Sequence, residues 1–161
     1  MQARLCTALA AGLLVCGALA APSKTIDEVI AHAERLKFGR LQAVDATYAN
    51  GRWAWEVYSV QTSRVVERRL DGASLRQVRM ERLSLNPLVS KLSIRQALRS
   101  VRKSVRGVVL SLELERSDEF GIVWSAIVRR AKDRVEVYID GTSGRLLETE
   151  VIERAEGSGG N

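Results

Sequence analysis

TIDEVIAHAERLKFGRL at residues 25–41 and SIRQALRSVRKSVRGVV at residues 93–109 are two versions of one pattern, related by a shift of 68 residues. Each opens with a hydroxyl residue that is followed three positions later by Glu28 or Gln96, which is the signature of a helix capping box. Apolar residues then recur at helical spacing, and a glycine stands near the end of each segment. These residues are Ile26, Val29, Ile30 and Ala33 with Gly39, and Ile94, Ala97, Leu98, Val101 and Val105 with Gly107. The sequence therefore predicts two equivalent helices, each begun by a capping box and ended by a glycine cap.

Beyond each glycine the apolar residues alternate with polar ones, which is the period of a β-strand. In the second copy, strands are expected at residues 108–115, 121–130, 135–139 and 145–152. In the first copy, they are expected at residues 41–48, 53–60 and 65–70. We therefore expect an α+β protein of two tandem small domains, in each of which one helix packs on an antiparallel sheet of three to four strands.

The domain boundaries follow from this repeat, whose length is too great for a solenoid unit and suits a duplicated small domain. Asn86-Pro87 marks a turn between the copies. Trp55 aligns with Trp124, and both rings are expected in the core beneath the helices rather than in a ligand platform. The expected divisions are a signal peptide at 1–20, a first repeat at 23–80, a linker at 81–92, a second repeat at 93–152 and a disordered tail at 153–161.

The amino-terminal segment has the form of a secretory signal peptide. A single basic residue, Arg4, precedes a mostly apolar run that ends in Ala18-Leu19-Ala20, and we expect cleavage after Ala20. An uncleaved membrane anchor is the alternative, and it needs about 20 spanning residues. The protein is therefore expected in the periplasm or outside the cell.

Cys16 offers a second alternative, a lipoprotein anchor, because it follows a short apolar segment. Val15 stands where a lipoprotein signal carries a small residue, so we prefer the secreted form. Cys6 lies in the same segment, and the cleaved chain then contains no cysteine. Disulfides, thiol catalysis and cysteine-bound metals are therefore excluded for the cleaved form.

The end of the second copy, YIDGTSGRLLE at residues 138–148, together with the capped helix and the glycine before it, resembles the PepSY domain family. In the closing hairpin of that family an Asp begins the turn and a Gly ends it, which assigns these structural roles to Asp140 and Gly144. The first copy has Asp71 at the equivalent place but Leu75 where the closing glycine belongs. The chain thus resembles two tandem PepSY copies.

The resemblance implies an exported protein in which a helix packs on an antiparallel sheet. PepSY-like modules occur in the propeptides of secreted metallopeptidases, where they are associated with keeping the peptidase inactive, and in small bacterial envelope proteins. The family has no catalytic residues, so the resemblance assigns none to this chain.

The residue inventory gives little support to catalysis. His32 is the only histidine, so a histidine triad or a zinc site would need carboxylates as its other members. Glu113 and Glu115 share one face of an expected strand, but the outward face of a half-exposed strand carries charges in any case. The turn at 141–144 lacks the lysine and the strand-to-helix context of a phosphate loop. We expect no enzyme activity, no cofactor and no bound metal.

The second helix carries the strongest binding signal. Arg95, Arg99, Arg102 and Arg106 follow one another at helical spacing, and no acidic residue occurs at positions 91–112. An arginine stripe of this kind binds carboxylates, phosphates or lipid headgroups through forked hydrogen bonds. An ordinary solvated helix face is the alternative. The formal net charge of +6 favours acidic partners, and these four arginines are the predicted binding residues.

The function expected from these features is that of a non-catalytic exported binding or regulatory module. Its expected partner is a protein of the cell envelope, either a secreted peptidase that it inhibits or a sensor that it modulates. The alternative is an envelope protein that binds anionic lipid or another polyanion surface. A hydrolase that uses only carboxylates is the third and weakest hypothesis, and no nucleic acid partner is expected.

Overall fold

The computed structural model describes residues 21–131 and 133–154. The predicted signal peptide at 1–20 lies outside the described residues, as does most of the predicted disordered tail. Within residues 21–131 and 133–154, no helix has the length and the apolar composition needed to cross a membrane.

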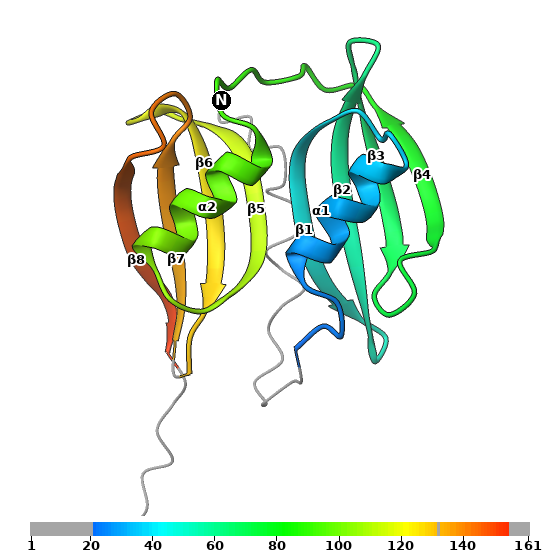
Figure 1. Ribbon diagram of the computed structural model, residues 1–161, viewed down its shortest axis with the longest axis horizontal. Helices are drawn as coiled ribbons and strands as arrows, with labels where there is room; N and C mark the ends of the chain where they lie inside the picture. The colour runs from blue at the N-terminus through cyan, green and yellow to red at the C-terminus, as the bar shows by residue number, and fades with distance from the viewer. Residues whose placement is uncertain (1–20, 132, 155–161) are drawn as a thin grey trace, which may run out of the picture.

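Each copy of the repeat folds as one helix followed by four strands (Figure 1). In the first copy these are α1 (Ile26–Arg35), β1 (Arg40–Ala49), β2 (Arg52–Gln61), β3 (Arg64–Asp71) and β4 (Gln77–Leu83). In the second copy they are α2 (Ile94–Ser104), β5 (Val108–Ser117), β6 (Gly121–Arg129), β7 (Asp133–Asp140) and β8 (Leu146–Arg154). The predicted helices and seven of the strands therefore lie where the periodicity placed them, give or take a few terminal residues.

The prediction of two separate helix-on-sheet domains is wrong, because the first strands of the two copies pair with each other. β1 and β5 run antiparallel, with Val44 opposite Leu112 and Asp45 opposite Ser111. A single antiparallel sheet results, in the order β4-β3-β2-β1-β5-β6-β7-β8. The period of a strand shows which side chains share a face, but it does not name the neighbouring strand.

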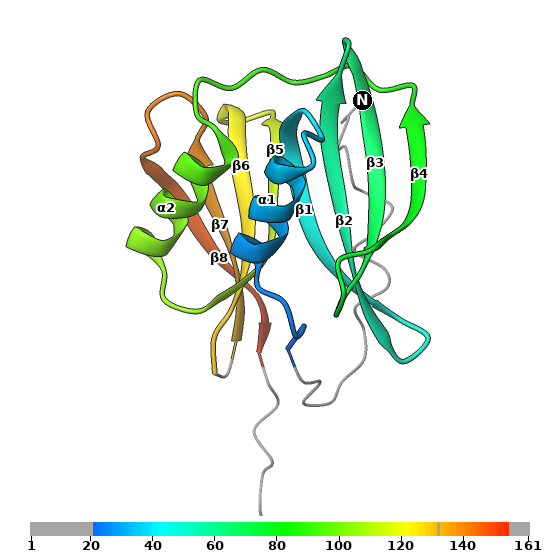
Figure 2. The same cartoon turned by 45° about the vertical axis from the view of Figure 1, so that its right-hand side comes forward.

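One core lies between this sheet and the two helices, which cover the same face of the sheet (Figures 1 and 2). α1 contacts β5 of the other copy, and α2 contacts β1. Trp55 and Trp124, one from each copy, are each 1% exposed within this core, as predicted. Because the buried residues of both copies form one continuous cluster, separating the copies would expose part of this core to water.

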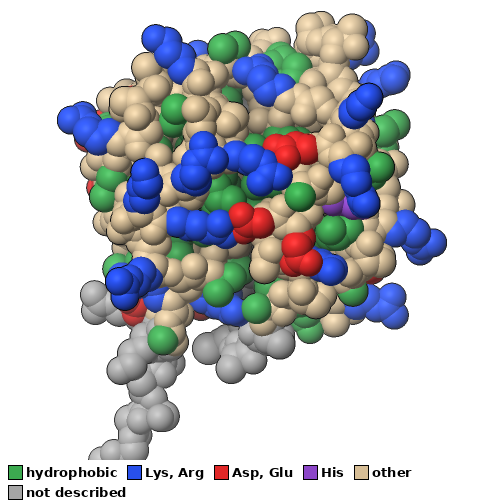
Figure 3. All heavy atoms as spheres, in the orientation of Figure 1, with side chains coloured by type: hydrophobic (Ala, Val, Ile, Leu, Met, Phe, Trp, Pro, Cys, Tyr) green, Lys and Arg blue, Asp and Glu red, His purple; other side chains and the backbone are tan. Residues whose placement is uncertain are grey.

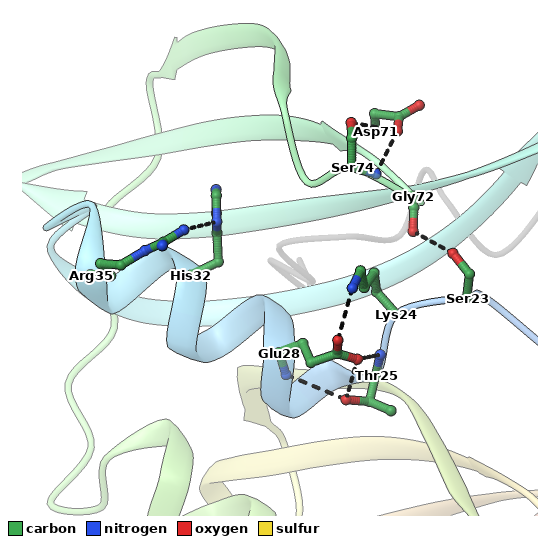
Figure 4. Close-up of polar contacts among 9 residues, drawn as sticks. All are labelled: Ser23, Lys24, Thr25, Glu28, His32, Arg35, Asp71, Gly72 and Ser74. Carbon is green, nitrogen blue, oxygen red and sulfur yellow. Dashed lines mark hydrogen bonds and ion pairs between the residues drawn. The ribbon is translucent and has the colours of Figure 1, made fainter.

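Both predicted capping boxes are present. Thr25 donates its backbone N–H to Glu28 Oε2 at 2.8 Å, and its hydroxyl accepts from the Glu28 N–H at 3.4 Å (Figure 4). Ser93 and Gln96 make the same reciprocal pair, at 2.8 and 3.3 Å. Each box satisfies backbone N–H groups that the first turn of a helix leaves without partners.

The two glycines do not cap the helices, contrary to the prediction. The C-cap residues are Leu36 and Val105, and Gly39 and Gly107 lie beyond them, just before β1 and β5. A Cβ atom on Gly39 would lie 2.3 Å from the carbonyl oxygen of Val60. Each glycine is therefore needed because the backbone enters the sheet in close contact with the neighbouring strand, not because a helix ends there.

The closing turn of the second copy is organised by its aspartate. Asp140 Oδ1 accepts hydrogen bonds from the backbone N–H groups of Thr142 at 3.1 Å and Ser143 at 2.6 Å, and Gly144 follows with φ +76°. A Cβ on Gly144 would lie 2.9 Å from Ser100 Oγ on α2, so a side chain there would require Ser100 to move.

The first copy makes the same turn with a leucine at the closing position. Asp71 Oδ1 accepts from the Ser74 N–H at 2.8 Å, and Leu75 takes the left-handed φ of +57°. The left-handed conformation costs a non-glycine residue about 1–2 kcal/mol. Leu75 is only 6% exposed, and burying a leucine stabilises the fold by about 1.5–3 kcal/mol. Burial therefore offsets the strain.

The sequence predicts no strand at β4, part of which falls in the expected linker at 81–92. β4 is a mostly exposed strand that pairs with β3, and its apolar residues, Val78 and Met80, alternate with charged ones. This alternation covers only Val78 to Glu81, because Arg82 stands where the next apolar residue is expected, and so short a pattern does not distinguish a strand from a linker.

Gly39→Ala is expected to destabilise the protein more than Gly51→Ala. Both glycines have positive φ, at +101° and +75°, but no atom lies within 4 Å of a Cβ built on Gly51. Gly51→Ala should therefore cost about 1–2 kcal/mol from backbone strain alone. Gly39→Ala adds the clash with Val60. Urea denaturation of both variants measures the difference, and equal losses would contradict the close-contact role of Gly39.

Candidate functional site

The four arginines of the predicted stripe separate into two pairs. Arg95 and Arg102 turn toward α1, where each binds a carboxylate. Arg99 is exposed on α2, and Arg106 is exposed just beyond the end of that helix. Two arginines of the stripe therefore join the helices, and the other two remain exposed to solvent.

The pairs that join the helices have forked geometry. Arg95 donates from Nε to Glu34 Oε1 at 2.9 Å and from Nη2 to Oε2 at 2.6 Å. Arg102 donates from Nη1 to Asp27 Oδ1 at 2.8 Å, and its Nη2 bonds the second oxygen. Forked arginine–carboxylate pairs fix orientation as well as adding energy.

These pairs perturb the charged groups in the expected directions. The hydrogen bond from Arg102 lowers the pKa of Asp27. The hydrogen bonds to Glu34 and to Asp27 raise the pKa values of Arg95 and Arg102, respectively. Since all four side chains are partly open to solvent, each pair contributes modestly to stability, about 1 kcal/mol or less.

The acidic half of this interface was not predicted from the sequence, although the repeat contains the signal. The shift of 68 residues relates Asp27 to Arg95 and Glu34 to Arg102. Each position is thus acidic in the first copy and basic in the second. These opposite charges form two ion pairs because the two helices lie next to each other in the fold, which the sequence does not show.

The cations that remain on α2 form the candidate site, which we call the α2 cationic face. It consists of Arg99 and Lys103 on the helix and Arg106 just after its C-cap, all exposed. In the part of the chain that the structure describes, none of the three forms an ion pair. Figure 3 shows Lys and Arg side chains over the α2 side of this surface, with acidic side chains over α1.

The α2 cationic face continues into an open depression of about 440 Å³ at the end of the helix. Arg106, Arg129 and Arg130 line it, together with Val108, whose side chain is 46% exposed. Arg130 also pairs with Asp133. The depression thus combines guanidinium groups with a small apolar patch.

The helix-free face of the sheet carries a cluster of polar residues that was not predicted from the sequence. The Ser111 hydroxyl on β5 donates to Asp45 Oδ1 on β1, so this bond crosses the junction between the copies. On the adjoining strand, Glu56 is 4% exposed and pairs with Arg69 at 3.1 Å. The signal was present in the sequence, because Asp45 stands between Val44 and Ala46 and Glu56 stands between Trp55 and Val57.

Both of these carboxyl groups are held in a poorly solvated environment. Asp45 retains some surface as a residue, but its Oδ2 atom is buried. Burial raises the pKa of Asp45 to about 7, the hydrogen bond from Ser111 opposes this, and the nearby charge of Glu56 adds to it. Burial likewise raises the pKa of Glu56, against the opposing charge of Arg69.

The single histidine, His32, lies on α1. His32 Nδ1 is 3.0 Å from Arg35 Nη2 (Figure 4), and burial, then the charge of Arg35, lowers the pKa of His32. Its ring lies edge-on to Phe38. Among residues 21–131 and 133–154, no three His, Cys, Asp or Glu side chains are placed to bind a metal ion.

Reversing one member of the Arg95–Glu34 pair is expected to lower the melting temperature, and reversing both is expected to restore it. Arg95→Glu places two carboxylates together, and Glu34→Arg places two guanidinium groups together. The double variant recreates an opposite-charge pair. Thermal denaturation of the four proteins should give a coupling energy of about 0.5–1 kcal/mol. Additive losses in the double variant would show that the pair does not join the helices.

Asp45→Asn is expected to remove a pH dependence of stability. The folded-state pKa of about 7 lies above the ordinary value of 3.8. The folded state therefore retains the proton more strongly, and stability falls as pH rises through this interval. Relative to wild type, Asp45→Asn should gain stability between pH values of about 4 and about 8. Parallel stability curves for the two proteins, from urea denaturation at each pH, would contradict this.

No family model matches this chain, and no curated protein matches it. Among solved structures, it is similar to a candidate lipoprotein from Clostridium difficile 630, with 15% identity and a TM-score of 0.45. That match covers 78% of this chain and 90% of the other. It is also similar to the C-terminal domain of YpeB from Bacillus megaterium, with 10% identity and a TM-score of 0.35, over 84% of this chain and 69% of the other.

Proposed function

We propose that this chain is an exported, non-catalytic binding module made of two PepSY-like repeats joined in one sheet. In this proposal the α2 cationic face docks an acidic segment of a partner protein in the cell envelope. The partner is a secreted peptidase that the module inhibits or a sensor protein that it modulates. The signal-like amino terminus and the PepSY-like turn at Asp140 support export and the repeat type.

The observation that carries the proposal is the way α2 already holds carboxylates. Arg95 and Arg102 each bind an acidic side chain of α1 through forked hydrogen bonds. Arg99 and Lys103 on the same helix, and Arg106 just beyond it, are exposed and form no ion pair within the described chain. An acidic segment lying along α2 would extend the row of ion pairs, and complementary charge of this kind guides association.

The second candidate, binding to an anionic lipid or polyanion surface, is favoured by the depression at the end of α2. There, Arg106, Arg129 and Arg130 surround an exposed valine. Guanidinium groups bind phosphate oxygens in the same forked manner as carboxylates. A phosphate headgroup would place its charge among the arginines and its apolar part near Val108.

Binding to a poly-glutamate peptide tests the proposal directly. The triple variant Arg99→Glu, Lys103→Glu and Arg106→Glu should weaken binding about tenfold or more, because it replaces three favourable contacts with repulsive ones. The matched control changes three exposed arginines elsewhere, with the same change in net charge: Arg52→Glu, Arg64→Glu and Arg116→Glu. Isothermal titration calorimetry at fixed salt measures both, and equal losses would attribute binding to net charge alone.

The same proteins distinguish the two candidates when they are titrated with phosphatidylglycerol vesicles. Docking of an acidic protein segment predicts stronger binding to poly-glutamate than to vesicles. Surface binding predicts the reverse, with an affinity that falls steeply as salt increases. Vesicle binding that the α2 triple variant abolishes, without measurable binding to poly-glutamate, would replace the leading proposal with the second.

A further inference from the structure

β4 is an open edge of the sheet. It pairs with β3 on one side and forms the end of the strand order on the other, as the view in Figure 2 shows. Val78 and Met80 are 54% and 52% exposed on this strand. An edge of this kind presents unpaired backbone N–H and C=O groups, to which another strand can add.

The side chains of β4 restrict which strand fits. Arg79 and Glu81 project from one face of the strand, where they pair with each other, and Met80 and Arg82 project from the other. Val78 lies at an irregularity in the pairing of β4 with β3. In an antiparallel pair, residues directly opposite each other lie on the same face. A partner for β4 therefore needs an acidic residue opposite Arg79, a basic residue opposite Glu81 and an apolar residue opposite Met80.

A second copy of β4 meets this requirement in one register. When Met80 stands opposite Met80 of the second copy, each Arg79 faces a Glu81 on one face of the strand. On the other face the two Met80 side chains meet, and each Val78 lies opposite the aliphatic stem of an Arg82. Moving the centre by one residue places Arg79 against Arg79 or Glu81 against Glu81, and like charges directly opposite are destabilising. The charge sequence of β4 is thus self-complementary about Met80.

The other edge of the sheet does not have this property. β8 carries Glu148, Glu150 and Glu153, of which Glu153 pairs with Arg134 of β7. Two β8 strands side by side would bring these carboxylates close to those of the second copy. Of the two open edges, the charge pattern therefore favours self-pairing at β4.

We propose that the protein forms a two-fold dimer in which β4 pairs antiparallel with β4 of a second copy, with Met80 opposite Met80. The sheet then continues through the dimer, and all four helices lie on one face of it. This interface covers Val78 and Met80 and satisfies the backbone groups of the edge. It also places two α2 cationic faces on the same side of the assembly, where they can engage a multivalent partner together.

Charge exchange at two positions tests both the dimer and its register. Arg79→Glu alone and Glu81→Arg alone should each make the protein monomeric, because like charges then meet across the two-fold axis. An equimolar mixture of the two single variants should dimerise, and so should the double variant. Light scattering coupled to size-exclusion chromatography measures the mass of each sample over a range of concentrations.

Two controls make the outcomes decisive. The side chains of Arg79 and Glu81 are 62% and 46% exposed, so circular dichroism and melting should show folded single variants. Glu150→Arg on β8 should leave the dimer intact.

A monomeric wild-type protein at every concentration overturns the proposal, as does a dimer that survives both single reversals. Growing oligomers in place of a dimer would indicate pairing of β4 with β8, which forms open chains.

Discussion

The pairing of β1 with β5 is the interaction on which the rest of the structure depends. Val44 lies opposite Leu112, and the shift that relates the two copies also relates these two residues. An approximate two-fold axis therefore passes between them. Pairing at this axis satisfies the backbone groups of two strands that would otherwise be open edges. It also brings both helices over one face of a single sheet, where they share a core.

The two copies have the same backbone pattern but differ in charge, and this difference explains how they meet. Across the axis, Asp27 and Glu34 of α1 face Arg102 and Arg95 of α2. Two first copies arranged in the same way would oppose carboxylates, and two second copies would oppose guanidinium groups. Specificity of this kind comes from the repulsion in the wrong pairings as much as from the attraction in the right one. The same divergence leaves α2 with more cations than α1 neutralises, and these form the candidate site.

Prediction from the sequence succeeded where the signal is local. Thr25 with Glu28 and Ser93 with Gln96 define the helix starts, because a capping box involves only neighbouring residues. It failed where the partner is distant in the chain. The roles of Gly39 and Gly107 depend on carbonyl groups of β2 and β6, so a helix cap was the nearest local interpretation. The candidate site was predicted in part, since Arg99 and Arg106 face solvent while Arg95 and Arg102 bind α1.

The sequence by itself determined the duplicated helix-and-strand pattern, the faces of the helices that are buried and the basic character of α2. These follow from periodicity, capping and charge, which act over a few residues. Only the tertiary structure decided that the copies share one sheet and one core, and which arginines remain open to a partner. These outcomes depend on strand pairing and on ion pairs between residues more than sixty positions apart, and no short-range pattern records such contacts.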